Sequence, residues 1–135
     1  MSEKLISIEK KGGNGGLTET TLWTNLSPSS AFAGQFVTLS SSLANYDVCR
    51  IYYKAFTTSS TELYVDYPKD FFIQSQETVE HLLMGLFARV GAGATYARMV
   101  KYISGTQLQF DTSYRISNGS SSNDYSIPTK ICGVK

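Results

Sequence analysis

Few residues in this chain could perform catalysis, and they are widely spaced. His81 is the only histidine, so any serine or cysteine nucleophile activated by an imidazole would have to use it. It follows Glu80 and precedes an apolar run, and no serine nearby lies in a Gly-x-Ser-x-Gly turn. We therefore interpret His81 as a sheet-edge or surface residue and predict that the protein is not an enzyme.

Carboxylates suggest a second chemistry, the acid and base pair of a glycoside hydrolase. Glu62, Asp66 and Asp111 could converge in such a pair, which would make the protein a glycan hydrolase. Asp70 lies close to Asp66 in sequence, but nothing in the spacing of these acids requires a shared site. We interpret them as solvated charges on strand edges and loops and keep the hydrolase as the third alternative.

The sequence predicts no metal site and no cofactor. Cys49 and Cys132 are too few and too far apart for a set of zinc ligands. We expect both to be small buried apolar residues, with a disulfide between them as the alternative. The glycine-rich stretch at 12–16 lacks the Gly-Lys-Ser/Thr ending of a phosphate-binding loop.

Tyrosine is the residue type whose number calls for an explanation. The chain has 9 Tyr, 7 Phe and 1 Trp, more tyrosine than one small core normally buries. Cross-strand aromatic pairs would account for most of them. The alternative is a carbohydrate-binding module, because a tyrosine ring with a polar tip suits stacking on a sugar. The candidate stacking residues are Tyr64, Tyr67, Tyr96 and Tyr114.

Length and charge exclude other classes of function. With 135 residues, 41% hydrophobic and 17% charged, the chain has the composition of one folded domain. A net charge of +1 gives no electrostatic basis for binding nucleic acid. No apolar stretch is long enough to span a bilayer, and the first residues lack the apolar region of a signal peptide. We expect a protein that is made in the cytoplasm and does not insert into membranes.

Alternation of apolar and polar residues predicts short strands joined by Ser-, Thr- and Gly-rich turns. In the stretch 48–56, Cys49, Ile51, Tyr53 and Ala55 share one face and would belong to the core. The other face would carry Val48, Arg50, Tyr52 and Lys54. The other strands are predicted at 20–25, 34–39, 62–67, 95–103, 106–111 and 125–134. This spacing predicts an all-β fold, an antiparallel β-sandwich with jelly-roll-like character.

One segment, 77–90, is compatible with either a helix or a strand. Its apolar residues follow a helical period: Val79, Leu82, Leu83, Leu86, Phe87 and Val90. Gly85 interrupts that pattern, and the turn Gly91-Ala92-Gly93 leads into a β-like run of similar length. We favour a strand hairpin.

The N-terminal residues 1–16 are predicted to form a tether, and residues 17–135 the β-sandwich domain. A short strand at 4–10 would anchor the chain to a partner through Leu5, Ile6 and Ile8. Four glycines follow it and would act as a hinge: Gly12, Gly13, Gly15 and Gly16.

Several local sequences together resemble a known family. They are Leu-Trp-Thr-Asn at 22–25, Ala-Phe-Ala-Gly-Gln at 31–35, the Tyr46-Asp47 turn, Ile-Tyr-Tyr-Lys at 51–54 and Lys-Ile-Cys-Gly-Val-Lys at 130–135. They resemble the β-module found at the C-termini of tail-fibre and minor structural proteins of phages and prophages, mostly of Gram-positive hosts. The resemblance covers roughly residues 20–135.

The resemblance implies a bacteriophage virion component and not an enzyme. It would be a tail fibre, head fibre, spike or decoration protein, located in the virion and commonly a homotrimer. Its partners would be other virion proteins, reached through the N-terminal segment, and a host cell-surface glycan. The expected function is receptor binding in host attachment, or particle assembly. The alternatives stay open: a module that binds host cell-wall glycan, or a glycan hydrolase.

Overall fold

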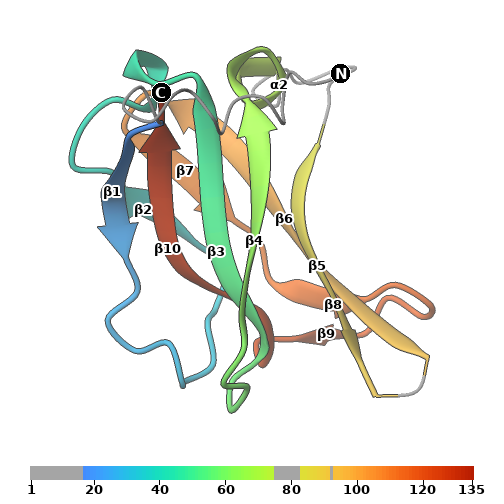
Figure 1. Cartoon of the computed structure of the whole chain (residues 1–135). Helices are drawn as coiled ribbons and strands as arrows, with labels where there is room; N and C mark the ends of the chain where they lie inside the picture. The colour runs from blue at the N-terminus through green and yellow to red at the C-terminus, as the bar shows by residue number, and fades with distance from the viewer. Residues whose placement is uncertain (1–16, 75–82, 92) are drawn as a thin grey trace.

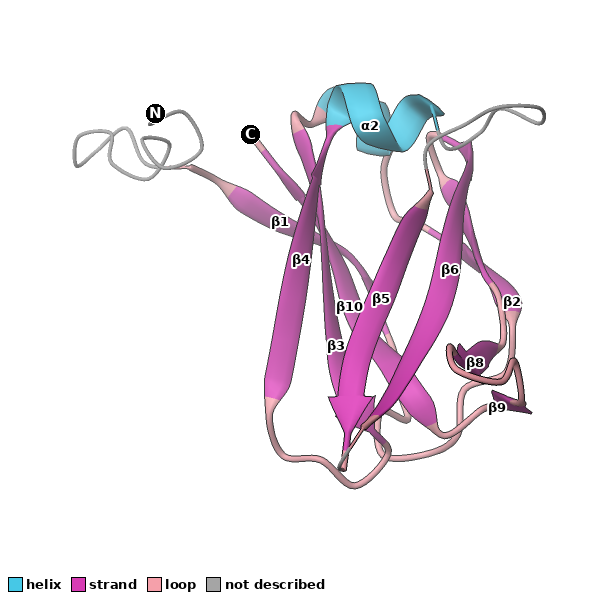
Figure 2. Ribbon diagram, turned by 90° about the vertical axis from the view of Figure 1, so that its right-hand side faces the viewer, coloured by secondary structure: helices cyan, strands magenta, loops and turns pink. Residues whose placement is uncertain are grey.

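The chain folds into two antiparallel β-sheets that pack face to face (Figure 1; Figure 2). The computed structural model describes residues 17–74, 83–91 and 93–135. Sheet A has the strand order β1 (Glu19–Thr24), β10 (Tyr125–Val134), β3 (Val48–Phe56) and β4 (Glu62–Pro68). The predicted all-β fold and antiparallel sandwich are confirmed.

Sheet B is built around its long strand β6 (Ala94–Ser104). On one side β6 pairs with β5 (Met84–Val90), and on the other with β7 (Gln107–Phe110) and β8 (Ser113–Arg115). The sheet is completed by β2 (Gln35–Thr38) beside β7 and by β9 (Ser121–Ser122) beside β8. The chain therefore changes sheets after β1, β2, β4 and β9.

The alternation seen in the sequence explains which residues enter the core. In β3, Cys49, Ile51 and Tyr53 are buried between the sheets, and Arg50 and Tyr52 lie on the outer face. The inner face of sheet B opposes them with Leu86, Leu108 and Phe110 among others. Strands β3 and β10 have the predicted bounds, because strong alternation between turn residues marks both ends.

The ambiguous segment contains a strand. Met84–Val90 forms β5 and pairs with β6, so the helical alternative is wrong for these residues. A Cβ atom at Gly85 would lie 2.9 Å from the ring of Phe87 and 3.0 Å from Met99, so a larger residue here would displace these two side chains. His81 and the rest of 75–82 lie outside the described residues.

Four short elements were not predicted from the sequence. Helix α2 (Lys69–Gln74) follows β4 directly and closes one end of the sandwich, with Phe72 fully buried 5.4 Å from the ring of Tyr102. A single 3-10 turn, η2 (Leu43–Asn45), precedes β3. Strands β8 and β9 have three and two residues, too few to show an alternation.

Both cysteines are free and buried, as predicted. In the register of β3 and β10, Cys49 lies opposite Gly133, and Cys132 lies opposite Arg50. Adjacent register positions project to opposite faces of a sheet, so the two thiols point away from each other. The alternative of a disulfide between them is therefore wrong.

The two ends of the sandwich differ in what they carry. At one end, Thr18 exchanges two backbone hydrogen bonds with Lys135, so the start and end of the domain lie side by side near α2 (Figure 1). The opposite end, called here the distal end, consists of the loops 25–34, 57–61 and 116–124 and the β5–β6 hairpin. The predicted tether, 1–16, lies outside the described residues.

Candidate functional site

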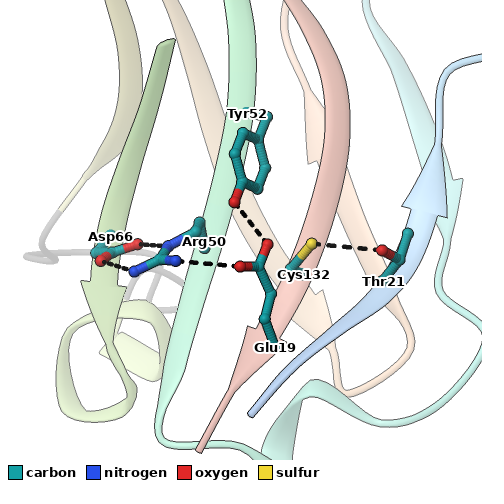
Figure 3. A network of polar contacts seen from close by, with 6 residues as sticks. All are labelled: Glu19, Thr21, Arg50, Tyr52, Asp66 and Cys132. Carbon is teal, nitrogen blue, oxygen red and sulfur yellow. Dashed lines mark hydrogen bonds and ion pairs between the residues drawn. The ribbon is translucent and has the colours of Figure 1, made fainter. Parts of the chain in front are cut away.

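The outer face of sheet A carries a network of polar side chains centred on Arg50 (Figure 3). The Arg50 guanidinium donates to both carboxylate oxygens of Asp66, at 2.7 Å from Nε and 2.9 Å from Nη2. Its Nη1 lies 3.2 Å from Glu19. The hydroxyl of Tyr52 donates to the other oxygen of Glu19 at 2.6 Å. These four residues, the Arg50 network, join strands β1, β3 and β4.

Strand order explains how the network forms. Arg50 lies directly opposite Asp66 of β4 on one side and opposite Cys132 of β10 on the other. Glu19 reaches Arg50 from β1, across β10, and Cys132 lies beneath it (Figure 3). The thiol of Cys132 contacts the hydroxyl of Thr21 at 3.7 Å. One guanidinium therefore links three of the four strands of sheet A.

Tyr64 extends the network along the same face. Tyr52 and Tyr64 are opposite each other in the register of β3 and β4, with ring centroids 5.5 Å apart. The Arg50 guanidinium lies 4.5 Å from the centroid of Tyr64, and the ammonium of Lys130 lies 4.4 Å from that of Tyr52. Tyr64 remains 56% exposed. The ring of Tyr64 is therefore exposed to solvent, and its neighbours Arg50 and Tyr52 hold its orientation.

The electrostatics of this face favour fixed charges over proton transfer. Burial alone would raise the pKa of Glu19, but hydrogen bonds from Tyr52 and Cys132 and the charges of Arg50 and Lys130 lower it. The hydrogen bond to Asp66 raises the pKa of Arg50. Burial, together with the bond to Glu19, raises the pKa of Tyr52 to about 12. None of these pKa values is moved toward neutrality, where a general acid or base works best.

The two thiols are not activated either. Burial raises the pKa of Cys132 to about 11 and that of Cys49 further still. The thiolate is the nucleophilic form of cysteine, so both side chains are unreactive at neutral pH. They act as buried packing residues.

The four predicted stacking tyrosines do not form one site. Tyr64 is on the outer face of sheet A, whereas Tyr67 packs inward, stacks on Phe71 and bonds to the backbone of β5. Tyr96 lies in sheet B with its ring stacked on Tyr125, and Tyr114 lies in β8. Their strands belong to two different sheets, so the four rings do not line one common surface, and sugar stacking by any one of them stays a prediction.

The predicted carboxylates also remain apart. Glu62 and Asp66 lie on one face of β4 four residues apart, or about 13 Å at the rise of a strand. A glycosidase pair needs a separation of about 5 to 9.5 Å. Glu62 accepts a hydrogen bond from Thr129, and Asp66 is held by Arg50. Asp111 follows β7 in sheet B, so no two of the three acids form such a pair.

Described residues at the distal end line two shallow hollows. One, of about 370 Å³, lies between the β3–β4 loop, the end of β5 and the start of β10, and is lined by Phe56, Thr57, Thr58, Val90, Asp124 and Tyr125. The other, of about 360 Å³, lies beside the loop after β1 and includes Trp23, Asn25, Leu26, Phe32 and Gln35. We call them the Asp124 hollow and the Trp23 hollow.

Sequence reasoning missed the residues that make these sites. The alternation in 48–56 did place Arg50 and Tyr52 on one outward face, which was the available signal for half of the Arg50 network. Glu19 could not be assigned to the network from the sequence, because no local pattern reveals that β1 lies beside β10 and β10 beside β3. The Asp124 hollow combines three segments that are distant in sequence, and no motif marks them.

Among the residues that the structure describes, no group of three or more His, Cys, Asp or Glu is placed to hold a metal ion. Within the same ranges, no helix is both long enough and apolar enough to cross a membrane. The sequence matches no protein-family model, and no curated protein shows significant similarity to it.

Proposed function

We propose that the chain is a non-enzymatic structural protein of a bacteriophage virion, which exposes its β-sandwich for host-surface attachment or particle assembly. The main observation behind the proposal is that the two ends of the sandwich differ: one end holds the two ends of the domain's chain, and the other holds the hollows. The domain begins beside its own C-terminus, where Thr18 pairs with Lys135, and both hollows lie at the distal end. A chain anchored through residues 1–16 would therefore direct its hollows away from the particle.

Two of the sequence motifs that resemble the phage module, at 22–25 and 31–35, pack against each other. Trp23, Phe32 and Phe110 form one ring cluster, with centroids 5.6 to 6.1 Å apart. Asn25 joins that cluster to β10 through a 2.8 Å hydrogen bond to Pro128. The first two motifs and the start of the closing strand thus pack as a single structural unit.

The last motif is explained by a close contact at the other end. A Cβ atom on Gly133 would lie 2.4 Å from the ring of Tyr46, so the ring packs flat on the glycine backbone. Lys135 lies over the same ring, at 5.6 Å from its centroid. Packing therefore joins Tyr46 to Gly133 and Lys135, which belong to a separate motif.

The outer face of sheet A suits a contact surface. Tyrosine and arginine are enriched at interfaces, and here they are ordered before any partner arrives. Side chains that are already fixed lose less entropy on binding. The Arg50 network with Tyr64 would therefore serve a lateral contact with a neighbouring virion protein or a sister subunit.

Two measurements test the proposal. Mass spectrometry of phage particles induced from the host should find the chain in the particle, and light scattering of the full chain should give the mass of a trimer. Charged substitutions at Leu5, Ile6 and Ile8 should abolish incorporation, while Glu3→Gln, a control in the same segment, should not. A monomer at micromolar concentration together with particles that lack the chain would refute the proposal.

A glycan-binding module is the second candidate function, and the Asp124 hollow is the observation that favours it. The hydrolase alternative has no comparable support, because Glu62, Asp66 and Asp111 do not approach one another as an acid and base pair must.

A further inference from the structure

The Asp124 hollow is lined by aromatic residues and by polar residues whose side chains have no hydrogen-bond partner among the described residues. Phe56, Val90 and Tyr125 form its apolar sides, and Thr57, Thr58 and Asp124 supply oxygens. Across the described residues, neither the Asp124 carboxylate nor the two threonine hydroxyls form a hydrogen bond or an ion pair. A bound molecule could therefore use all of these oxygens without breaking an existing contact.

Two contacts connect the segments that form the hollow. The ring of Tyr125 stacks on Tyr96 at a centroid distance of 3.8 Å and an angle of 17°. The backbone N–H of Thr57 donates to the carbonyl of Asp124 at 3.2 Å, which ties the β3–β4 loop to the start of β10. Tyr96 therefore supports the ring of Tyr125 from outside the described lining of the hollow.

Its chemistry selects a class of ligand. A carboxylate can accept hydrogen bonds from two adjacent hydroxyls, threonine hydroxyls both donate and accept, and a tyrosine ring packs against the C–H face of a sugar. The volume of about 370 Å³ is at the lower end of the range for small-molecule sites, roughly 300–1,000 Å³. Its described lining includes Asp124 but no basic residue, and the buried Arg98 beside it is bonded to backbone carbonyls, so the lining offers an anionic ligand no cationic partner.

We infer that the Asp124 hollow binds a neutral sugar unit of a host-surface glycan, with the Asp124 carboxylate accepting from its hydroxyls and the Tyr125 ring against its apolar face. The inference rests on the proposed attachment function and assigns it a site and a ligand class. A single shallow hollow binds weakly, but several copies on one particle would raise the avidity by about 10²–10⁴-fold.

The Trp23 hollow is a weaker candidate because its amides are already engaged. Asn25 donates to Pro128 and accepts from the backbone of Ser27, and Gln35 donates to Ala33. A ligand there would have to replace these hydrogen bonds. It provides an internal comparison for the experiment.

The test measures binding of the full chain to a panel of neutral monosaccharides and oligosaccharides, with sialic acid and glycerol phosphate as anionic members. Ligand titrations followed by NMR or calorimetry suit weak binding. Asp124→Ala should lower the affinity for the neutral sugars about tenfold to a hundredfold, since a charged hydrogen-bond acceptor is lost. Asp70→Asn, which removes one acid at the α2 end, should leave the affinity unchanged.

Three outcomes would overturn the inference: no neutral sugar binds, anionic sugars bind best, or Thr24→Val in the Trp23 hollow lowers the affinity while Asp124→Ala does not. Failure of the attachment proposal is a separate result, recorded by the absence of the chain from particles. If the chain is found in particles but does not bind neutral sugars, the proposed function stands and the assignment of a sugar site to the Asp124 hollow is wrong.

Discussion

The hydroxyl of Tyr67 closes the outer edge of β5 by bonding both backbone groups of Gly85. It donates to the Gly85 carbonyl at 2.8 Å and accepts from the Gly85 N–H at 3.0 Å. The hydroxyl of Tyr53 donates to the carbonyl of Phe87 at 2.7 Å. These tyrosines come from β4 and β3 of the opposite sheet (Figure 2). They replace a neighbouring strand along an edge that would otherwise be open to pairing with another chain.

Tyr67→Phe should therefore destabilise the fold by about 1–3 kcal/mol, because it leaves a buried N–H and a buried C=O without partners. Urea unfolding at pH 7 measures the change. Tyr64→Phe is the matched control, since Tyr64 is exposed, and it should alter the free energy of unfolding by less than about 0.5 kcal/mol. Equal stabilities for the two variants would show that the Tyr67 hydroxyl does not stabilise the edge.

The contact between Tyr67 and Gly85 also shows which parts of the fold can be predicted from the sequence and which cannot. The alternation in 48–56 and 125–134 predicted two strands at their observed bounds, since a period of two depends only on neighbouring residues. The sequence shows a surplus of tyrosine, but it does not show that some of these tyrosines bond to the edge of β5. That role requires β4 to face β5 across the sandwich. That facing depends on how the two sheets pack, and no local period encodes it.

The residues of the candidate sites also divide into those that a local pattern predicts and those that it does not. Arg50 and Tyr52 were placed on one outward face from their spacing in a single strand. Their partners Glu19 and Asp66 come from β1 and β4, which only the strand order brings within reach. The four stacking tyrosines were chosen by residue type alone, and they lie in both sheets for the same reason.

A second prediction concerns Gly133, whose backbone supports the ring of Tyr46. Gly133→Ala should cost about 1–3 kcal/mol, because the new methyl group would overlap ring atoms now 2.4 to 2.8 Å from its position. In a Tyr46→Ala background the same substitution should cost less than about 1 kcal/mol, since the ring is gone. Denaturant unfolding of the four proteins gives the coupling energy. The same cost in both backgrounds would contradict the contact.

A third prediction is a pH dependence that comes from Glu19. Its folded pKa is lower than the ordinary value of 4.5, so the carboxylate adds stability above pH 4.5 and loses it as the pH falls through the folded pKa. Glu19→Gln should lower the free energy of unfolding at pH 7 by up to about 1 kcal/mol, since the network is partly exposed. Urea midpoints at pH 7, 5 and 3 should show the difference from the unsubstituted chain shrinking toward zero. A difference that persists undiminished at pH 3 would assign the effect to packing instead.

The last prediction concerns Arg98, which is fully buried in β6 and whose hydrogen-bond partners among the described residues are all carbonyl oxygens. Its Nε donates to Ser126 at 2.8 Å, Nη1 to Asp111 at 2.7 Å, and Nη2 to Tyr125 at 3.0 Å. Burial lowers its pKa to about 10, which still leaves it charged at neutral pH. The guanidinium therefore fixes the start of β10, beside the Asp124 hollow.

Arg98→Lys should destabilise the protein by about 3–5 kcal/mol, because an ammonium cannot reproduce the planar fork and leaves a buried charge and carbonyls poorly paired. Arg89→Lys, at an exposed position of β5, should change stability by less than about 0.5 kcal/mol. Hydrogen exchange gives a more specific readout: in Arg98→Lys, protection should fall first at the amides around Tyr125 and Ser126, before the centre of β3. A uniform loss of protection, or a cost below 1 kcal/mol, would show that the fork does not hold β10 in place.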